Sequence, residues 1–128
     1  MKILITGILI LISTYVSAQK RKVILCGITL PNKENGIFLD VNEYKNCDRT
    51  LTLSDTTFRV TEFTLELIPD NPNIKAISFP ITNAQIPENM TSYICNQVKS
   101  IYLKNIIAIN EKGKAITIPT AYIGVKIH

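Results

Sequence analysis

The sequence predicts an all-β fold: an immunoglobulin-like antiparallel β-sandwich of about seven strands with one short helix. Apolar residues alternate with polar ones through most of the chain, with the period of two that is typical of strands. Clusters of Pro, Asn, Asp and Gly interrupt this alternation at short intervals, as turns do. The chain has 128 residues, of which 46% are hydrophobic, so it is long enough to bury a single core.

Residues 1–18 have the pattern of a cleavable signal peptide. Lys2 is followed by an apolar run over residues 3–16, and small residues lead up to Ala18, after which we expect cleavage. A membrane span needs about 20 apolar residues, and this run is shorter. We therefore expect a mature single domain over residues 19–128, without a membrane span, located in the periplasm or secreted.

Seven segments of the mature chain are expected to form strands, because each alternates apolar and polar residues between turn signals. They are residues 22–30, 37–41, 49–54, 57–68, 74–81, 101–108 and 115–127. The side chains expected to face the core are Ile24, Cys26, Ile28 and Leu30 in the first segment, and Ile77, Phe79 and Ile81 in the fifth.

Two of these segments change parity along their length. In residues 57–68, Phe58 and Val60 have one parity, whereas Phe63 has the other. Successive side chains of a strand point to opposite faces, so this change predicts a bulge near Thr61-Glu62. A similar change predicts a second bulge at Lys104-Asn105. Strands that bend in this way are typical of two packed sheets.

The helical segment and the last hairpin have their own signals. Pro87 and Glu88 suit the first turn of a helix, and Met90, Ile94 and Val98 recur at a spacing of four. We therefore expect a short amphipathic helix that covers one end of the core. Further along, Gly113 favours a turn between the last two strands, and Pro119 predicts an edge position or a bulge in the final one.

No combination of residues suggests catalysis. The single histidine is His128, at a chain end that cannot hold a general base in place. Glu62 and Glu66 alternate with apolar residues, so we expect them to face solvent rather than to act as an acid and base pair. We expect no enzymatic activity, no metal and no cofactor.

The charge distribution argues against nucleic-acid binding. The net charge is +4, of which Lys2 contributes one, and the basic residues are spread along the chain except at Lys20-Arg21-Lys22. This triplet adjoins the predicted cleavage site, where a solvated terminus is expected. No helix-turn-helix, zinc-finger spacing or aromatic and basic interleaving accompanies it.

Three cysteines remain in an exported chain, so two of them can form a disulfide. The three pairings among Cys26, Cys47 and Cys95 stay open from the sequence alone. Cys26 falls in an alternating apolar run, so we expect it to be a small buried side chain. Cys47 lies between Asn46 and Asp48 and is expected to be the most exposed of the three.

Parts of the second half resemble the C-terminal domain of the gliding-motility protein family GldM and PorM. The segments concerned are residues 58–65, with an Arg-Val and Phe-Thr strand motif, 86–90, 101–108 and 116–127. Together they cover residues 57–128. The resemblance implies a periplasmic adhesive or scaffold module of a Bacteroidetes-type envelope, similar to the domain that meets the outer-membrane ring of type IX secretion.

The chain also departs from that family. Residues 96–100 lack the glycine turn that usually follows the helix, and the last hairpin reads Asn-Glu-Lys-Gly over residues 110–113 where the family often has Gly-Pro-Asp-Gly. The family proteins have an N-terminal transmembrane helix and several upstream domains, whereas a cleavable signal and one domain are expected here. The resemblance therefore does not imply motor function.

Two functions remain as hypotheses. The first is a non-catalytic binding or scaffold module that contacts another envelope protein through a sheet edge. In it, Lys104, Lys126 and Pro119 would keep unwanted strands from pairing. The alternative is a secreted module that binds a small ligand, a glycan or a protease through an exposed loop over residues 43–48. Tyr44 would be its anchor, and Cys47 a reactive or bridged thiol.

Overall fold

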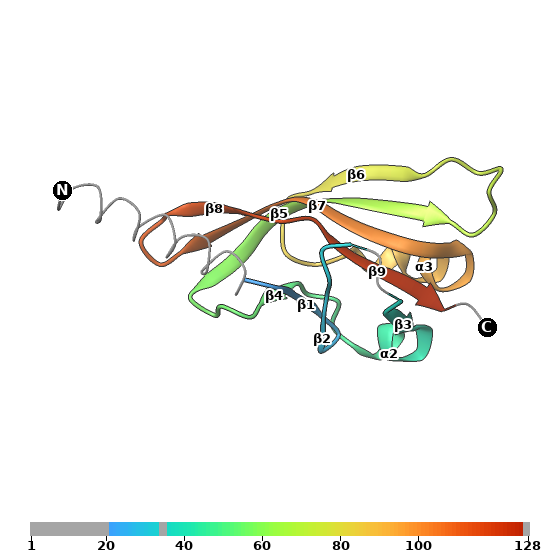
Figure 1. The fold of residues 1–128 in the computed structure, drawn as a ribbon, viewed down its shortest axis with the longest axis horizontal. Coiled ribbons are helices and arrows are strands. Elements are labelled where there is room, and N and C mark those ends of the chain that lie inside the picture. The colour runs from blue at the N-terminus through green and yellow to red at the C-terminus, as the bar shows by residue number, and fades with distance from the viewer. Residues whose placement is uncertain (1–20, 34–35, 127–128) are drawn as a thin grey trace, which may run out of the picture.

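The computed structural model describes residues 21–33 and 36–126, so the predicted signal peptide and His128 lie outside the described residues. The described part of the chain has nine strands in two sheets, which confirms the predicted all-β sandwich (Figure 1). The strands are β1 (Val23–Leu25), β2 (Ile28–Thr29), β3 (Phe38–Asp40), β4 (Thr52–Leu53), β5 (Phe58–Pro69), β6 (Ile77–Ile81), β7 (Val98–Asn110), β8 (Ala115–Ile118) and β9 (Ala121–Lys126). The helices are α2 (Val41–Asn46), the 3-10 helix η1 (Glu88–Met90) and α3 (Thr91–Gln97).

The large sheet has the order β3-β9-β7-β5-β6, with β8 also paired to β7, and the small sheet has the order β2-β1-β4. Figure 1 shows the small sheet and α2 on the same side of the large sheet. All pairs are antiparallel except β3 and β9, which run parallel. No helix in the described part of the chain is long and apolar enough to cross a membrane.

Both predicted bulges are confirmed in the central pair, β5 and β7. Val60 lies opposite Ala108 and Glu62 opposite Ile107, so β5 has one extra residue at this point. The next pair is Thr64 with Lys104, so β7 has an extra residue shortly afterwards, where Asn105 adopts a φ of 50°. The two bulges compensate, and the apolar side chains therefore face the core on both sides of the bend. Those of β5 that are buried are Phe58, Val60, Phe63, Leu65 and Leu67.

The predicted return strand over residues 115–127 is broken in two. Pro119 and Thr120 separate β8 from β9, as expected for a proline that cannot donate to the ladder. Both parts pair with β7, and β9 also pairs with β3. The prediction that Lys104 and Lys126 protect a sheet edge is therefore wrong, because β7 and β9 are interior strands.

The first hairpin does not follow the expected alternation. Cys26 and Gly27 form a two-residue turn between β1 and β2, with φ of 52° and 76°. The turn changes the parity, so Val23, Leu25 and Leu30 are buried whereas Cys26 is half-buried. The prediction that Cys26 is a buried side chain is wrong for this reason.

A short helix replaces the exposed loop expected over residues 43–48. Asp40 ends β3 and caps α2, since its carboxylate accepts the N–H groups of Asn42 at 2.7 Å and Glu43 at 3.4 Å. The helix turns Tyr44 into the core, where its side chain is 0% exposed. Tyr44 therefore cannot be the exposed anchor that the sequence suggested.

The one helix that the sequence predicts is confirmed as η1 followed by α3. It buries Ile94 and leads directly into β7, whose first residue, Val98, is also buried. Met90 is half-buried and packs against the same core. The helical spacing of these residues thus brings one apolar face onto the end of the sandwich, as expected.

Phe38 packs over a glycine on the outer face of the large sheet. A Cβ added at Gly124 would lie 2.6 Å from Cδ1 of Phe38, a residue that is itself 60% exposed. We expect Gly124→Ala to lower the free energy of unfolding by about 1–3 kcal/mol, because the added methyl must displace the ring and its strand. Denaturant unfolding of the two single variants and the double variant Phe38→Ala/Gly124→Ala measures this. The loss at Gly124 should shrink without the ring, and an equal loss in both backgrounds would contradict the packing argument.

Candidate functional site

The two sheets leave a groove between β4 and the first half of β5, which we call the β4–β5 groove. Its volume is about 410 Å³. It is lined by Thr50, Leu51, Thr52, Leu53, Thr56, Phe58, Arg59, Val60 and Ala84. The side chains of Leu51, Leu53, Phe58 and Val60 are buried and form its floor, whereas Thr52, Thr56 and Arg59 are exposed. The groove therefore offers an apolar floor beneath a polar rim.

The first half of β5 has no strand partner on the side away from β7 in the described part of the chain. On that side β6 pairs only with residues 63–67 of β5. After β6 ends at Ile81, the chain no longer pairs with β5 and instead joins the segment before β4. There Leu51 donates its N–H to the carbonyl of Ala84 at 2.7 Å. Residues 58–62 consequently present an unpaired edge.

The hydrogen bonds at the end of this ladder show which backbone groups face outward. The N–H of Phe58 bonds to the carbonyl of Asp55 at 3.3 Å, and that of Asn110 to Lys114 at 3.1 Å. Phe58 and Asn110 lie opposite each other, so they are a pair without mutual hydrogen bonds. Pairs with and without mutual hydrogen bonds alternate along antiparallel strands, so Val60 and Ala108 are the next pair without them. The N–H and C=O of Val60 therefore point away from β7.

A second unpaired edge belongs to β4. Ser54 donates its N–H to the carbonyl of Lys22 at 2.9 Å, which identifies these two residues as a hydrogen-bonded pair of the small sheet. Leu53, one position earlier, lies opposite Val23 and directs its own N–H and C=O away from β1. Leu53 and Val60 both line the β4–β5 groove, so two open strand edges border the same apolar depression.

A network of polar contacts fixes the turn at one end of the groove. The Thr57 hydroxyl donates to Oδ1 of Asp55 at 2.6 Å, and the Thr57 N–H does so at 3.1 Å. Nε of Arg21 lies 3.2 Å from Oδ2 of Asp55, and its guanidinium carbon lies 4.5 Å from the ring centroid of Phe58. The Thr57 hydrogen bonds, with help from Arg21, hold the pKa of Asp55 below its ordinary value of 3.8. The Asp55 carboxylate is therefore charged, and accepts these hydrogen bonds, at neutral pH.

Arg59 is exposed on the rim and makes no ion pair with any of the described residues. It also lines a neighbouring surface groove of about 410 Å³, next to the turn between β7 and β8. An exposed guanidinium between two depressions favours a ligand with a carboxylate at this position.

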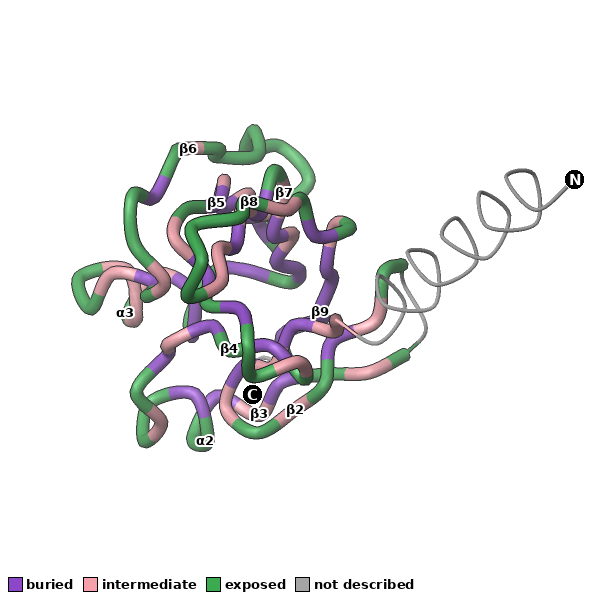
Figure 2. The backbone as a smooth tube through the Cα atoms, turned by 90° about the vertical axis from the view of Figure 1, so that its left-hand side faces the viewer, coloured by how far each residue is buried: buried purple, intermediate pink, exposed green. Residues whose placement is uncertain are grey.

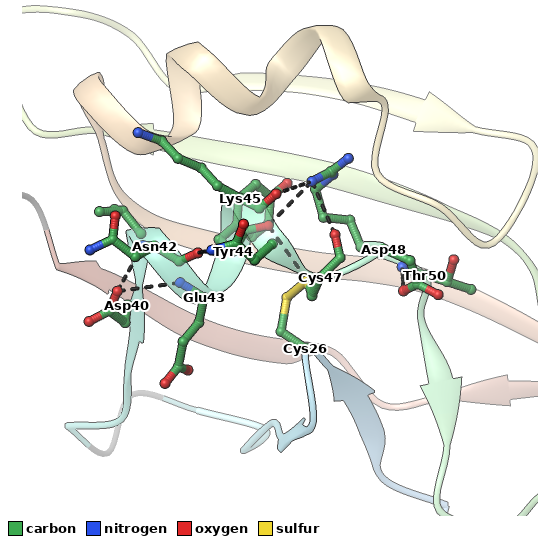
Figure 3. Close-up of a disulfide and its surroundings, with 12 residues drawn as sticks. Cys26, Asp40, Asn42, Glu43, Tyr44, Lys45, Cys47, Asp48 and Thr50 are labelled. Atoms are coloured by element: carbon green, nitrogen blue, oxygen red, sulfur yellow. Dashed lines mark hydrogen bonds between the residues drawn. A yellow bond between two sulfur atoms is a disulfide. The ribbon is translucent and has the colours of Figure 1, made fainter.

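The residues singled out from the sequence lie elsewhere, and the structure does not bring them together at this groove. Cys26 and Cys47 form a disulfide (Figure 3), which is one of the three pairings left open. Cys95 is an unbridged, buried thiol. Cys47 is half-buried at the end of α2. The disulfide joins the first hairpin to that helix.

Burial dominates the chemistry around α2. It raises the pKa of the Tyr44 hydroxyl, and the charge of Arg49 only partly opposes this effect. Burial likewise raises the pKa of the Cys95 thiol, against the opposing charges of Lys45 and Arg49. Both groups therefore stay protonated at neutral pH, and Cys95 does not have the lowered pKa of a reactive thiol.

The two lysines lie on interior strands. Nζ of Lys104 is 3.1 Å from Oε1 of Glu66 and 5.4 Å from the ring centroid of Tyr102. Lys126 is exposed at the end of β9, opposite Asp40 in the register of β3. Within the described residues, no group of three or more His, Cys, Asp and Glu side chains could hold a metal ion.

No protein-family model, curated protein or solved structure matches the chain. The groove and its open edges are therefore the features on which a function can be argued. The sequence predicted a strand over residues 49–54, but it did not single out the groove. The rim residue Arg59 was part of the motif behind the family resemblance and had no assigned role.

Proposed function

We propose that the chain is a non-catalytic binding or scaffold module of the cell envelope that takes up an extended segment of another envelope protein in the β4–β5 groove. The observation that carries this proposal is the pair of open edges, at Leu53 and Val60, over one apolar floor. An added strand gains main-chain hydrogen bonds from such an edge and specificity from the pockets beside it.

The chemistry of the groove describes the bound segment. It is extended, because it must pair with the backbone of β5 at Val60. Apolar side chains on one of its faces fill the floor formed by Leu53 and Phe58. An acidic residue meets Arg59, which otherwise lacks an opposite charge among the described residues. The signal-like residues 1–18 and the resemblance to the GldM and PorM domain support placing this partner in the periplasm.

The alternative module, which binds a small ligand, a glycan or a protease through an exposed loop, has less support. Its loop over residues 43–48 falls largely within α2, and its anchor Tyr44 is buried. The available depressions are open grooves with an unpaired strand edge, which suits a polypeptide better than a compact molecule.

A bulky residue in the groove tests the proposal. Thr52 is exposed and lines the groove, so Thr52→Trp should block it without disturbing the core. Chemical crosslinking in intact envelopes, followed by mild extraction, should recover a partner with the natural chain and with the control Thr117→Trp, on the exposed face of β8. Recovery should fall at least tenfold with Thr52→Trp.

A peptide experiment then separates strand addition from side-chain contact alone. The crosslinked segment of the partner, made as a synthetic peptide, should bind the natural chain. Two further peptides carry backbone N-methyl groups, one at the odd and one at the even positions. The peptide whose N-methyl groups face β5 should not bind, and the other should bind. Equal recovery with Thr52→Trp, or equal binding of all N-methylated peptides, would remove the groove as the binding site.

A further inference from the structure

A different edge of the large sheet is also open. β6 pairs with β5 on one side, and no strand of the described part of the chain pairs with its other side. Ile77 on β6 is 39% exposed, and Ile74 just before it is 44% exposed. Figure 2 shows β6 and the loop before it as largely exposed. Of the predicted inward set of this strand, Ile81 is buried and Phe79 half-buried, whereas the prediction for Ile77 is wrong because β6 is an edge strand.

β6 is less protected than the other edges of its sheet. From Ala76 to Asn83 no side chain is charged. By contrast, β3 has three residues and ends at Asp40, and β8 lies between Lys114 and Pro119. Charged residues, prolines and short length are the usual means of preventing edge pairing, and β6 has only Pro80 within it and Lys75 before it.

The register shows which backbone groups β6 presents outward. Tyr122 donates its N–H to Pro31 at 2.9 Å, away from β7, so Tyr122 and Tyr102 do not share hydrogen bonds. Tyr102 must then bond to Glu66 of β5, because bonds alternate from side to side along a strand. The same alternation turns Leu65 and Leu67 toward β6.

It follows that Phe79, which lies opposite Leu65, directs its N–H and C=O toward β5. Ser78 and Pro80 therefore face outward. Pro80 has no N–H, so its position on the outer side leaves the ladder with β5 intact. The open edge offers a donor and an acceptor at Ser78, an acceptor at Pro80, and both groups at Ala76 if the strand extends by one residue.

We propose that a second copy of the chain pairs with this edge, β6 to β6, antiparallel, with Ser78 at the two-fold axis. In this register the two Ser78 residues exchange both hydrogen bonds. Each Ala76 N–H donates to the Pro80 carbonyl of the other copy. Because Pro80 has no N–H, the Ala76 carbonyl is the one group of this pair that stays without a partner. Centring the pair on Pro80 instead would provide no donor at the axis.

Side chains and charges also fit this occupant. Ile77 lies opposite Phe79 of the second copy, which covers the exposed isoleucine with a half-buried aromatic ring. Lys75 lies opposite Ile81 of the second copy, so no like charges face each other. A strand paired here must be apolar and uncharged, and β6 itself satisfies this condition. The contact is isologous, as closed dimers require.

Sedimentation equilibrium on the mature chain tests the dimer. The natural chain should sediment as a dimer at high concentration, and Ile77→Lys should weaken association at least tenfold, because it places a lysine against Phe79 of the other copy and brings two like charges close together across the contact. Gln97→Lys adds the same charge at an exposed position on α3 and should leave the dimer unchanged. A monomer at every concentration would overturn the proposal.

A cysteine at the axis tests the register independently of any effect on folding. Ser78→Cys should form a disulfide-linked dimer under mild oxidation, because paired residues across two strands lie about 5.5 Å apart at Cα. Thr117→Cys, on the exposed face of β8, should remain uncrosslinked. Equal crosslinking of both variants would overturn the proposed register. Thr52→Trp should leave the dimer intact, so this test is independent of the groove.

Discussion

Replacing Cys26 and Cys47 together by serine should lower the free energy of unfolding by about 3 kcal/mol. The disulfide closes a loop with a sequence separation of 21, and a crosslink of that span removes about 3 kcal/mol of chain entropy from the unfolded state. The bond also ties α2, a helix of six residues that is too short to be stable alone, to the β1–β2 turn. Urea unfolding of the natural and double-serine chains measures the difference.

Two controls distinguish the disulfide from the loss of a cysteine side chain. Cys95→Ala removes a buried but unbridged cysteine and should cost only about 1 kcal/mol, as an ordinary core substitution does. A reducing agent should destabilise the natural chain and leave the double-serine variant unchanged. If reduction leaves the natural chain as stable as before, the disulfide contributes no stability and this account of α2 is wrong.

The bulged central strands and the second helix could be predicted because their signals are local. The change of parity between Val60 and Phe63 can be read within a few residues, and it corresponds directly to the register shift in β5. The spacing of Met90, Ile94 and Val98 likewise needs no knowledge of the rest of the fold. Patterns of this kind follow from the geometry of a single strand or helix, so they can be interpreted without knowledge of the tertiary structure.

The N-terminal third was harder to predict because one turn and one cap were missed. Cys26 adopts a positive φ, which a non-glycine residue rarely does, and nothing in an alternating run indicates such a turn. α2 did have a signal, since Asp40 followed three residues later by Glu43 is the pattern of a helix start. Reading that pattern would have moved Tyr44 from a loop to a helix and suggested its burial.

The β4–β5 groove could not have been found from the sequence. It exists because the chain stops pairing with β5 after Ile81, the last residue of β6, and joins the segment before β4. There Leu51 bonds to Ala84 and Thr50 bridges to Gln85. This choice depends on packing between segments more than thirty residues apart. No local pattern encodes which half of β5 remains unpaired, so the open edge at Val60 is a property of the tertiary structure.

A buried arginine holds the end of α2. Nη1 of Arg49 donates to the carbonyls of Tyr44 at 3.3 Å, Lys45 at 3.4 Å and Cys47 at 3.2 Å. These groups belong to the last turn of the helix and the residue after it, where carbonyls lack partners and a positive charge is favoured. The Arg49 side chain is 8% exposed and also pairs with Glu88, which is 79% exposed. One side chain thus satisfies the carbonyls of Tyr44 and Lys45 at the helix end.

Arg49→Met should therefore lower the free energy of unfolding by about 2–4 kcal/mol, because buried carbonyls lose a charged donor while the side-chain volume is kept. Glu88→Gln should change it by less than about 1 kcal/mol, since a pair with one exposed partner is largely screened by water. Denaturant unfolding of both variants measures the contrast. If the two substitutions cost the same, Arg49 acts mainly as the partner of Glu88 rather than as the cap of α2. Hydrogen exchange of the α2 amides separates these roles further, because protection should fall in Arg49→Met and persist in Glu88→Gln.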